Sequence, residues 1–236
     1  MAATQPILSR LLSSTIDALF PPRCAGCGAG GSFFCQRCVA SLVPIAPPWC
    51  PKCGEPSSSD ALCTRCRQHP LEIDAIRSCY RYEGRLREAV LALKYQNLRA
   101  AAPDLAQLMT SSLRSLALDV EAIVPVPLHP RRLRERGYNQ SSLLARELGK
   151  ATGLPVLERG LVKVRHTAPQ ARAADLAARR ANVRDAFEAS PEVVSGRRVL
   201  LIDDVCTSGS TLDAAARALK SAGASAVYGL TLAREV

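Results

Sequence analysis

The sequence is poor in aromatic, histidine and methionine side chains, and it contains no apolar run of membrane-spanning length. Phe, Trp and Tyr together make up 4% of the 236 residues, and there are three His and two Met. The core therefore has to be built mainly from Ala, Leu and Val, which the 47% hydrophobic content allows. A membrane-spanning helix needs roughly 20 consecutive apolar residues, so we expect no transmembrane segment.

The first twenty residues lack the basic start and uninterrupted apolar stretch of a secretory signal. Ile7, Leu8, Leu11 and Leu12 instead recur among polar residues at helical spacing. We predict an amphipathic helix within residues 1–20 that packs on the rest of the protein, and a cytoplasmic location. The alternative is a helix on a membrane surface, which is less favoured because its polar face carries little positive charge.

Positive charge is abundant and unevenly placed. The formal net charge is +10, and residues 131–184 contain thirteen Lys/Arg against four Asp/Glu, a local net of +9. Such a segment attracts polyanions, either a phosphorylated small molecule or a nucleic acid. The alternative is a general solubility charge in an Arg-rich protein.

Eight of the ten cysteines lie between residues 21 and 70 as four Cys-x-x-Cys pairs, in a segment with little apolar periodicity. Two such pairs complete a tetrahedral site of four thiolates, and prolines divide the segment into two similar halves. We predict a double zinc ribbon over 21–70 with two structural Zn²⁺ ions, in preference to a dithiol redox motif or disulfides. The ligands are Cys24, Cys27, Cys35 and Cys38 in the first site, and Cys50, Cys53, Cys63 and Cys66 in the second.

Beyond residue 70, strand and helix patterns alternate. This alternation is typical of an α/β fold, with a mainly parallel sheet covered by helices on both faces. We predict strands at 75–82, 122–127, 198–203 and 225–232, and helices at 84–95, 103–118, 141–152, 175–182 and 210–222.

The strand predicted at 198–203 leads into a candidate phosphate site. Two carboxylates, Asp203 and Asp204, end the apolar run, and small polar residues connect it to the next helix: Thr207, Ser208, Gly209, Ser210 and Thr211. Backbone N–H groups and hydroxyls at such a junction bind phosphate. The Walker and dinucleotide-binding glycine motifs are absent. Carboxylates beside a phosphate repel it unless they face hydroxyl groups of the same ligand, so the pattern indicates a phosphorylated sugar. The alternative is a capped helix start that binds no ligand.

The run from Val199 to Thr211 resembles the signature of type I phosphoribosyltransferases. Residues 124–140, residues 165–187 and the pair Lys94-Tyr95 are similar to the ComF/GntX group. The resemblance implies the type I phosphoribosyltransferase fold over 71–236 and binding of phosphoribosyl pyrophosphate (PRPP) with Mg²⁺. It also implies that Asp203 and Asp204, our catalytic candidates, hold the ribose hydroxyls while residues 207–211 cradle the 5′-phosphate.

Further ligand contacts are expected from basic and polar residues outside this loop. In the wider fold a loop after the strand at 122–127 receives the pyrophosphate, and Arg side chains suit phosphate oxygens. The alternative there is a solvated basic turn. Residues 163–184 resemble the mobile hood that closes over the ligand in such folds. The candidates are Arg131, Arg132, Arg136, Lys94 and Gln170.

The resemblance implies a link to DNA uptake in natural competence and leaves two functions open. The first is a phosphoribosyltransferase, which displaces pyrophosphate from ribose C1. The second is a non-catalytic accessory protein that responds to PRPP and binds single-stranded DNA, together with proteins of DNA uptake. The basic segment and the zinc ribbons are compatible with DNA binding, but the ribbon region offers few aromatic side chains for base stacking.

Overall fold

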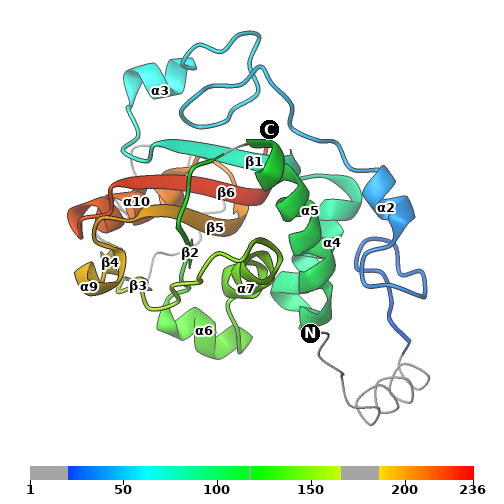
Figure 1. Ribbon diagram of the computed structural model, residues 1–236. Helices are drawn as coiled ribbons and strands as arrows, with labels where there is room; N and C mark the ends of the chain where they lie inside the picture. The colour runs from blue at the N-terminus through cyan, green and yellow to red at the C-terminus, as the bar shows by residue number, and fades with distance from the viewer. Residues whose placement is uncertain (1–20, 117, 166–185) are drawn as a thin grey trace, which may run out of the picture.

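The computed structural model describes residues 21–116, 118–165 and 186–236 (Figure 1). The helices predicted within 1–20 and at 175–182, and the candidate Gln170, lie outside these residues. No helix in the described part of the chain is long and apolar enough to cross a membrane.

A parallel sheet forms the centre of the molecule, as predicted. Its strands are β1 (Ala75–Arg81), β2 (Ala122–Pro125), β5 (Arg198–Cys206) and β6 (Ala226–Arg234), in the order β1-β6-β5-β2. Every neighbouring pair is parallel. The two central strands are apolar along most of their length because both of their faces are buried.

Two strand ends differ from the sequence prediction. β2 ends at Pro125, two residues earlier than predicted, although the Val126 N–H still donates to the Ile202 carbonyl. β5 continues three residues past Asp203, because Val205 and Cys206 still pair with β6. Both carboxylates therefore lie on the strand itself and are held by its hydrogen bonds.

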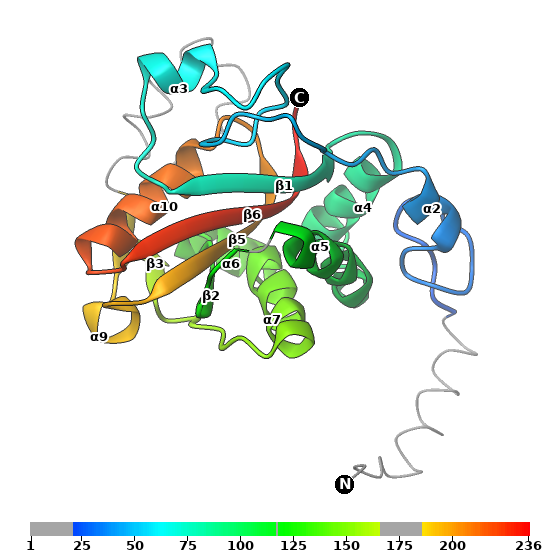
Figure 2. The same ribbon diagram turned by 45° about the horizontal axis from the view of Figure 1, so that its top comes forward.

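Helices cover both faces of the sheet, which confirms the two-sided arrangement (Figure 2). One face carries Leu200, Ile202 and Leu232 and packs against three helices. The other carries Val199 and Leu201 and packs mainly against α10 (Ser210–Ser221), with Val194 and Cys66 of two short helices in the same cluster. The three helices of the first face are α4 (Gly84–Tyr95), α5 (Ala102–Leu116), which follows the short η1 (Arg99–Ala101), and α7 (Gln140–Thr152).

A short helix, α6 (Pro130–Arg136), occupies the place where we expected a loop. Its ends are set locally: the His129 ring accepts a hydrogen bond from the Arg131 N–H, Pro130 occupies the first turn, and Gly137 ends the helix at φ 79°. Next to it lies an antiparallel pair, β3 (Leu161–Lys163) and β4 (Phe187–Ala189), followed by α9 (Pro191–Val194). None of these elements was predicted.

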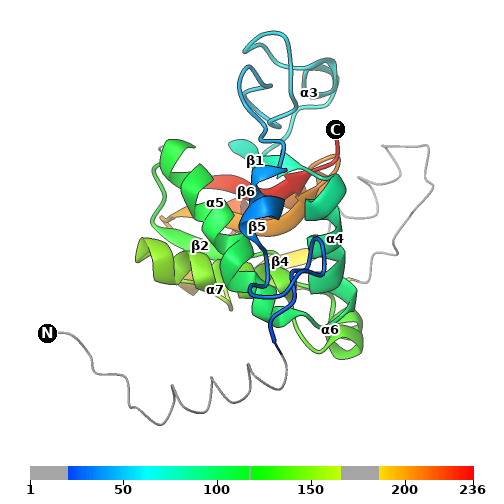
Figure 3. The same ribbon diagram turned by 90° about the vertical axis from the view of Figure 1, so that its right-hand side faces the viewer.

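The cysteine-rich segment forms two small units at different places on the core (Figure 3). The first contains α2 (Gln36–Ala40) and lies beside α4 and α5, where the Phe34 N–H donates to the Asp104 carboxylate at 2.8 Å. The second contains α3 (Thr64–Gln68) and lies against the edge strand β1, where the Ile76 N–H donates to the Lys52 carbonyl at 2.8 Å. The domain boundary predicted at residue 70 stays a prediction.

Candidate functional site

The eight paired cysteines form two clusters, and each brings four sulfurs within 4.8 Å of one another. In the first cluster the Cys24 and Cys38 sulfurs are 3.6 Å apart, and those of Cys27 and Cys35 are 3.7 Å apart. A tetrahedron with Zn–S bonds of about 2.3 Å has edges of about 3.8 Å. These spacings fit a zinc ion held by four thiolates.

The two clusters repeat the same local design. The Cys35 N–H donates to the Cys24 sulfur at 3.3 Å, and the Cys63 N–H donates to the Cys50 sulfur at 3.4 Å. Burial opposes ionisation of Cys24 and Cys50, but the surrounding N–H donors outweigh it and lower the pKa of each thiol to about 6. Burial and the neighbouring sulfurs instead raise the pKa of Cys38 and Cys66. Each site thus favours one thiolate through its N–H donors, and zinc binding requires the remaining thiols to lose their protons as well. All ten cysteines are free of disulfides, so the two four-cysteine sites fit two structural zinc ions.

The two carboxylates at the end of β5 are surrounded by donors from other elements. Asp203 accepts hydrogen bonds from the Ser141 hydroxyl at 2.8 Å and from the Asp204 N–H at 2.9 Å. Lys94, at the end of α4, lies 3.0 Å from Oδ1 of Asp204. Oδ2 of Asp204 is buried and has no hydrogen-bond partner among the described residues. The pair therefore presents an acceptor that suits the hydroxyl of a ligand.

Burial and mutual repulsion govern the charge of this pair. Burial, followed by the neighbouring Asp204 charge, raises the pKa of Asp203 to about 7. Burial also opposes the charge of Lys94, but the two carboxylates outweigh it, so the pKa of Lys94 lies above its ordinary value. Lys94 thus stays protonated and acts as the counterion of the pair.

The phosphate loop connects β5 to α10 directly beyond these carboxylates. Gly209 adopts φ 79°, and a Cβ there would lie 2.8 Å from Cδ1 of Ile76, so only glycine fits. The Ser208 and Ser210 hydroxyls lie 2.8 Å apart at the start of α10. The loop therefore offers N–H groups and hydroxyls at a helix N-terminus, where an anion is favoured. Thr207 is exposed, and Thr211 lies in the first turn of α10.

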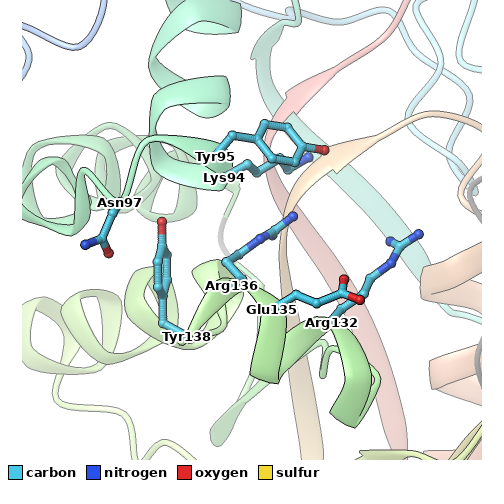
Figure 4. Close-up of a pocket in the computed structure, with 7 residues that line it drawn as sticks. All are labelled: Lys94, Tyr95, Asn97, Arg132, Glu135, Arg136 and Tyr138. Atoms are coloured by element: carbon cyan, nitrogen blue, oxygen red, sulfur yellow. The ribbon is translucent and has the colours of Figure 1, made fainter.

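A cleft of about 480 Å³ opens beside Lys94, between the end of α4 and α6. Figure 4 shows Arg132 and Arg136 of α6 in this cleft, with the side chain of Arg136 pointing toward Tyr95. The Arg136 guanidinium lies 5.2 Å from the centre of the Tyr95 ring and also donates to the Gln140 side chain. Arg131 does not line the cleft; it is exposed and pairs with Glu135 at 2.9 Å. Two of the three predicted arginines thus meet Lys94, and the third faces solvent.

Sequence reasoning missed two residues around the carboxylates, Ser141 and Lys163. Tyr95, which the sequence offered only as part of a motif, lines the cleft. Burial and the nearby Arg132 lower the pKa of Lys163, with Asp203 acting in the opposite sense. Lys163 also lies 5.1 Å from the centre of the Phe187 ring, across the β3–β4 pair. Lys163 lies on a strand too short to show an alternation of apolar and polar residues in the sequence. Both Ser141 and Lys163 are also far in sequence from the carboxylate Asp203 that they approach.

Comparison with known proteins agrees with this architecture. Residues 15–67 match the family model of the double zinc ribbon domain, and residues 138–234 match that of the phosphoribosyl transferase domain. The chain is 34% identical to DNA utilization protein YhgH of Salmonella typhimurium, over 85% of this chain and 88% of the relative. It is 32% identical to competence protein F of Haemophilus influenzae and 28% identical to competence protein ComFC of Bacillus subtilis; these matches cover 85% of this chain and 88% and 83% of the relatives.

Proposed function

This chain belongs to the ComF family of competence and DNA utilization proteins, and on that premise we propose that it binds PRPP with Mg²⁺ at the end of β5. The observation that supports the proposal most strongly is the arrangement of Asp203 and Asp204 between the phosphate loop and a cleft lined by arginines. A phosphorylated sugar with free hydroxyls can donate hydrogen bonds to the two carboxylates and place its anionic groups in the loop and beside the arginines.

In the proposed complex the 5′-phosphate occupies the loop at 207–211, where it receives the N–H groups at the start of α10. The ribose hydroxyls donate to the two carboxylates. This use of the carboxylates is supported by Oδ2 of Asp204, which is buried without a donor among the described residues. A nucleotide phosphate in the same place would meet two negative charges.

The pyrophosphate group is assigned to the cleft with Arg132 and Arg136, and Lys94 lies between the cleft and the carboxylates. Mg²⁺ would arrive with the diphosphate, since this ion usually keeps several waters and binds to phosphates together with one or two carboxylates. Asp203 and Asp204, together with Glu135, which lines the cleft, are the described carboxylates available to it. Gln170 remains a proposed ligand contact.

Transfer of the phosphoribosyl group would then require a nucleophile that displaces pyrophosphate from ribose C1. The described residues would contribute position and charge: the loop and the carboxylates would fix the ribose, and the arginines would stabilise the departing pyrophosphate. The relatives carry names that refer to DNA utilization and competence, and these names support a role of such chemistry in that context. We propose a cytoplasmic role there, where a reducing environment preserves zinc–thiolate sites.

A direct test combines binding and turnover. We expect saturable binding of PRPP in the presence of Mg²⁺ by calorimetry, and at least a tenfold loss of affinity in the double variant Asp203→Asn plus Asp204→Asn, because several hydrogen bonds are removed. Arg131→Ala is the control, since Arg131 lies outside the cleft. Absence of binding by the unmodified protein would refute the proposal.

The second candidate function is a PRPP-responsive accessory protein that binds single-stranded DNA without turnover. It is favoured by the competence-related names of the relatives and by the basic segment at 131–184. Pyrophosphate release, measured with bases, amines and single-stranded DNA as candidate acceptors, separates the two. PRPP binding without release, together with salt-sensitive DNA binding, would favour the accessory role.

A further inference from the structure

Arg234, at the end of β6, is a completely buried arginine, with 0% of its side chain exposed. Arginine is almost never fully buried unless it is paired, because removing its charge from water is costly. The proposed ligand site does not include it. Its hydrogen-bond and ion-pair partners therefore have to compensate for the loss of water around its charge.

Those partners lie in the second cysteine unit and at the residue directly before the phosphate loop. One terminal nitrogen, Nη1, donates to the Cys53 carbonyl at 2.9 Å and to the Cys206 sulfur at 3.1 Å. The other, Nη2, donates to the Glu55 carboxylate at 2.7 Å. Cys53 is a metal-ligand candidate, and Cys206 is the last residue of β5, directly before Thr207. One guanidinium thus contacts the zinc knuckle and the start of the loop.

A second contact path runs parallel to the first, through Ile76 of β1. The Ile76 N–H donates to the Lys52 carbonyl, and the knuckle backbone lies so close that a Cβ on Gly54 would be 2.4 Å from the Ile76 carbonyl oxygen. The backbone of Ile76 makes these contacts, whereas its side chain limits the loop, since a Cβ on Gly209 would lie 2.8 Å from Ile76 Cδ1. Ile76 is therefore packed between the knuckle and the phosphate loop.

The first zinc cluster has different neighbours. Arg85 donates to the Gly26 carbonyl at 3.1 Å, and Asp104 accepts from the Phe34 N–H. These contacts lie at the start of α4 and on α5. Because both clusters are built from two Cys-x-x-Cys pairs but touch different parts of the core, each provides a control for the other.

We propose that Arg234 is a positioning residue that couples the second zinc site to the phosphate loop, so that zinc bound there strengthens the binding of a phosphorylated sugar. The inference rests on the proposed function for its ligand. Zinc fixes the knuckle backbone, since the binding free energy of a structural metal contributes directly to folding. The fixed Cys53 carbonyl and Glu55 hold Arg234, and Arg234 with Ile76 holds the loop. By thermodynamic linkage, the ligand strengthens zinc binding by the same factor.

The test compares matched variants of the full chain, with zinc content measured for each. Cys66→Ser removes a ligand of the second site, and Cys38→Ser removes the equivalent ligand of the first, the third residue of α2 as Cys66 is of α3. Arg234→Met breaks the link and leaves all eight sulfurs in place, while Arg234→Lys keeps the charge. Arg85→Met, which removes a contact to the other knuckle, is its control.

Hydrogen exchange of the amides at 205–211, measured without ligand, is the first readout. We expect faster exchange in Cys66→Ser and Arg234→Met, a smaller change in Arg234→Lys, and no change in Cys38→Ser or Arg85→Met. The second readout is the Kd for PRPP with Mg²⁺, which should rise by about tenfold in the first two variants, within the usual range of coupling between sites. Arg234→Met should retain two zinc ions.

Unchanged loop exchange in a folded, zinc-loaded Arg234→Met protein would overturn the coupling, and so would equal effects of the two cysteine variants. If Cys66→Ser does not fold, the two Arg234 variants decide the question alone. Failure of the unmodified protein to bind PRPP would instead overturn the proposed function, and the exchange readout would still decide whether zinc positions the loop.

Discussion

Replacing Lys94 by Met should destabilise the protein by an amount that increases with pH. Lys94 lies 3.0 Å from the Asp204 carboxylate, with side chains 19% and 4% exposed. Removing one partner of a fully buried pair costs about 3–5 kcal/mol. Because Lys94 is partly open to solvent, we expect the lower end, about 3 kcal/mol, at pH 8.

Protonation limits this cost at lower pH. Without Lys94 the two carboxylates repel each other unopposed, so the pKa of Asp203, already raised to about 7 by burial and by Asp204, rises further. The native state then binds a proton that the unfolded chain has lost, and stability falls as pH rises toward the raised pKa. Because the parent Asp203 already titrates at about 7 within this interval, the difference corresponds to about one pKa unit. At about 1.4 kcal/mol per pKa unit, the loss at pH 6 should be smaller than at pH 8 by about 1 kcal/mol.

Urea unfolding of the variant and the parent protein at pH 6 and pH 8 measures this difference. Lys94→Arg keeps the charge and should lose less at both pH values. Adding Asp204→Asn to Lys94→Met removes one of the two acids and should recover part of the loss at pH 8. A loss in Lys94→Met that is equal at both pH values, or larger at pH 6, would refute the assignment of Lys94 as the counterion.

Three further predictions concern the loop, the acid pair and the cleft. Gly209→Ala should cost roughly 1–2 kcal/mol in thermal unfolding and abolish sugar-phosphate binding, because the position requires φ 79° and the new Cβ would meet Ile76; a variant that binds normally would contradict the role of the loop. Asp203→Asn should flatten the pH dependence of stability between about 4 and 7, because the raised pKa makes the native state lose stability as pH rises through that window; an unchanged slope in urea titrations would show that another group titrates. Arg136→Ala should weaken PRPP binding by about tenfold, the loss of one charged hydrogen bond, whereas Arg131→Ala should leave the Kd within twofold; equal effects would place the pyrophosphate outside the cleft.

The sequence predicted those parts of the fold that depend on local pattern. The helix at 84–95 and the helix that begins at Ser210 have the expected bounds or nearly so, since apolar periodicity marks both and Gly223 marks the end of the second. The eight zinc-ligand candidates meet as expected, because the Cys-x-x-Cys spacing brings the sulfurs of each pair together.

Parts of the site that depend on distant contacts could not be predicted in this way. The Ser141 hydroxyl meets Asp203 across 62 positions of the chain, and Arg234 meets Cys53 across 181. An arginine at the end of the last strand has the sequence pattern of a solvent-exposed residue, and only the position of the second ribbon against β1 buries it. Helix α6 was missed for another reason. Its capping residues His129, Pro130 and Gly137 can be read from the sequence, but the helix is rich in arginine and has no apolar periodicity that would predict it.

The arrangement of charge around β5 restricts the ligand more than the loop does alone. A loop at a helix N-terminus accepts any phosphate, but Asp203 and Asp204 precede it on the same strand, and Lys94 offsets only part of their charge. Arg132 and Arg136 add positive charge on the far side of that lysine. A ligand that satisfies all three regions carries an anion at each end and uncharged donors between them. PRPP has this order of groups, with its 5′-phosphate, its ribose hydroxyls and its pyrophosphate, whereas a nucleoside triphosphate bound through its phosphate chain would bring its negative charge against the carboxylates.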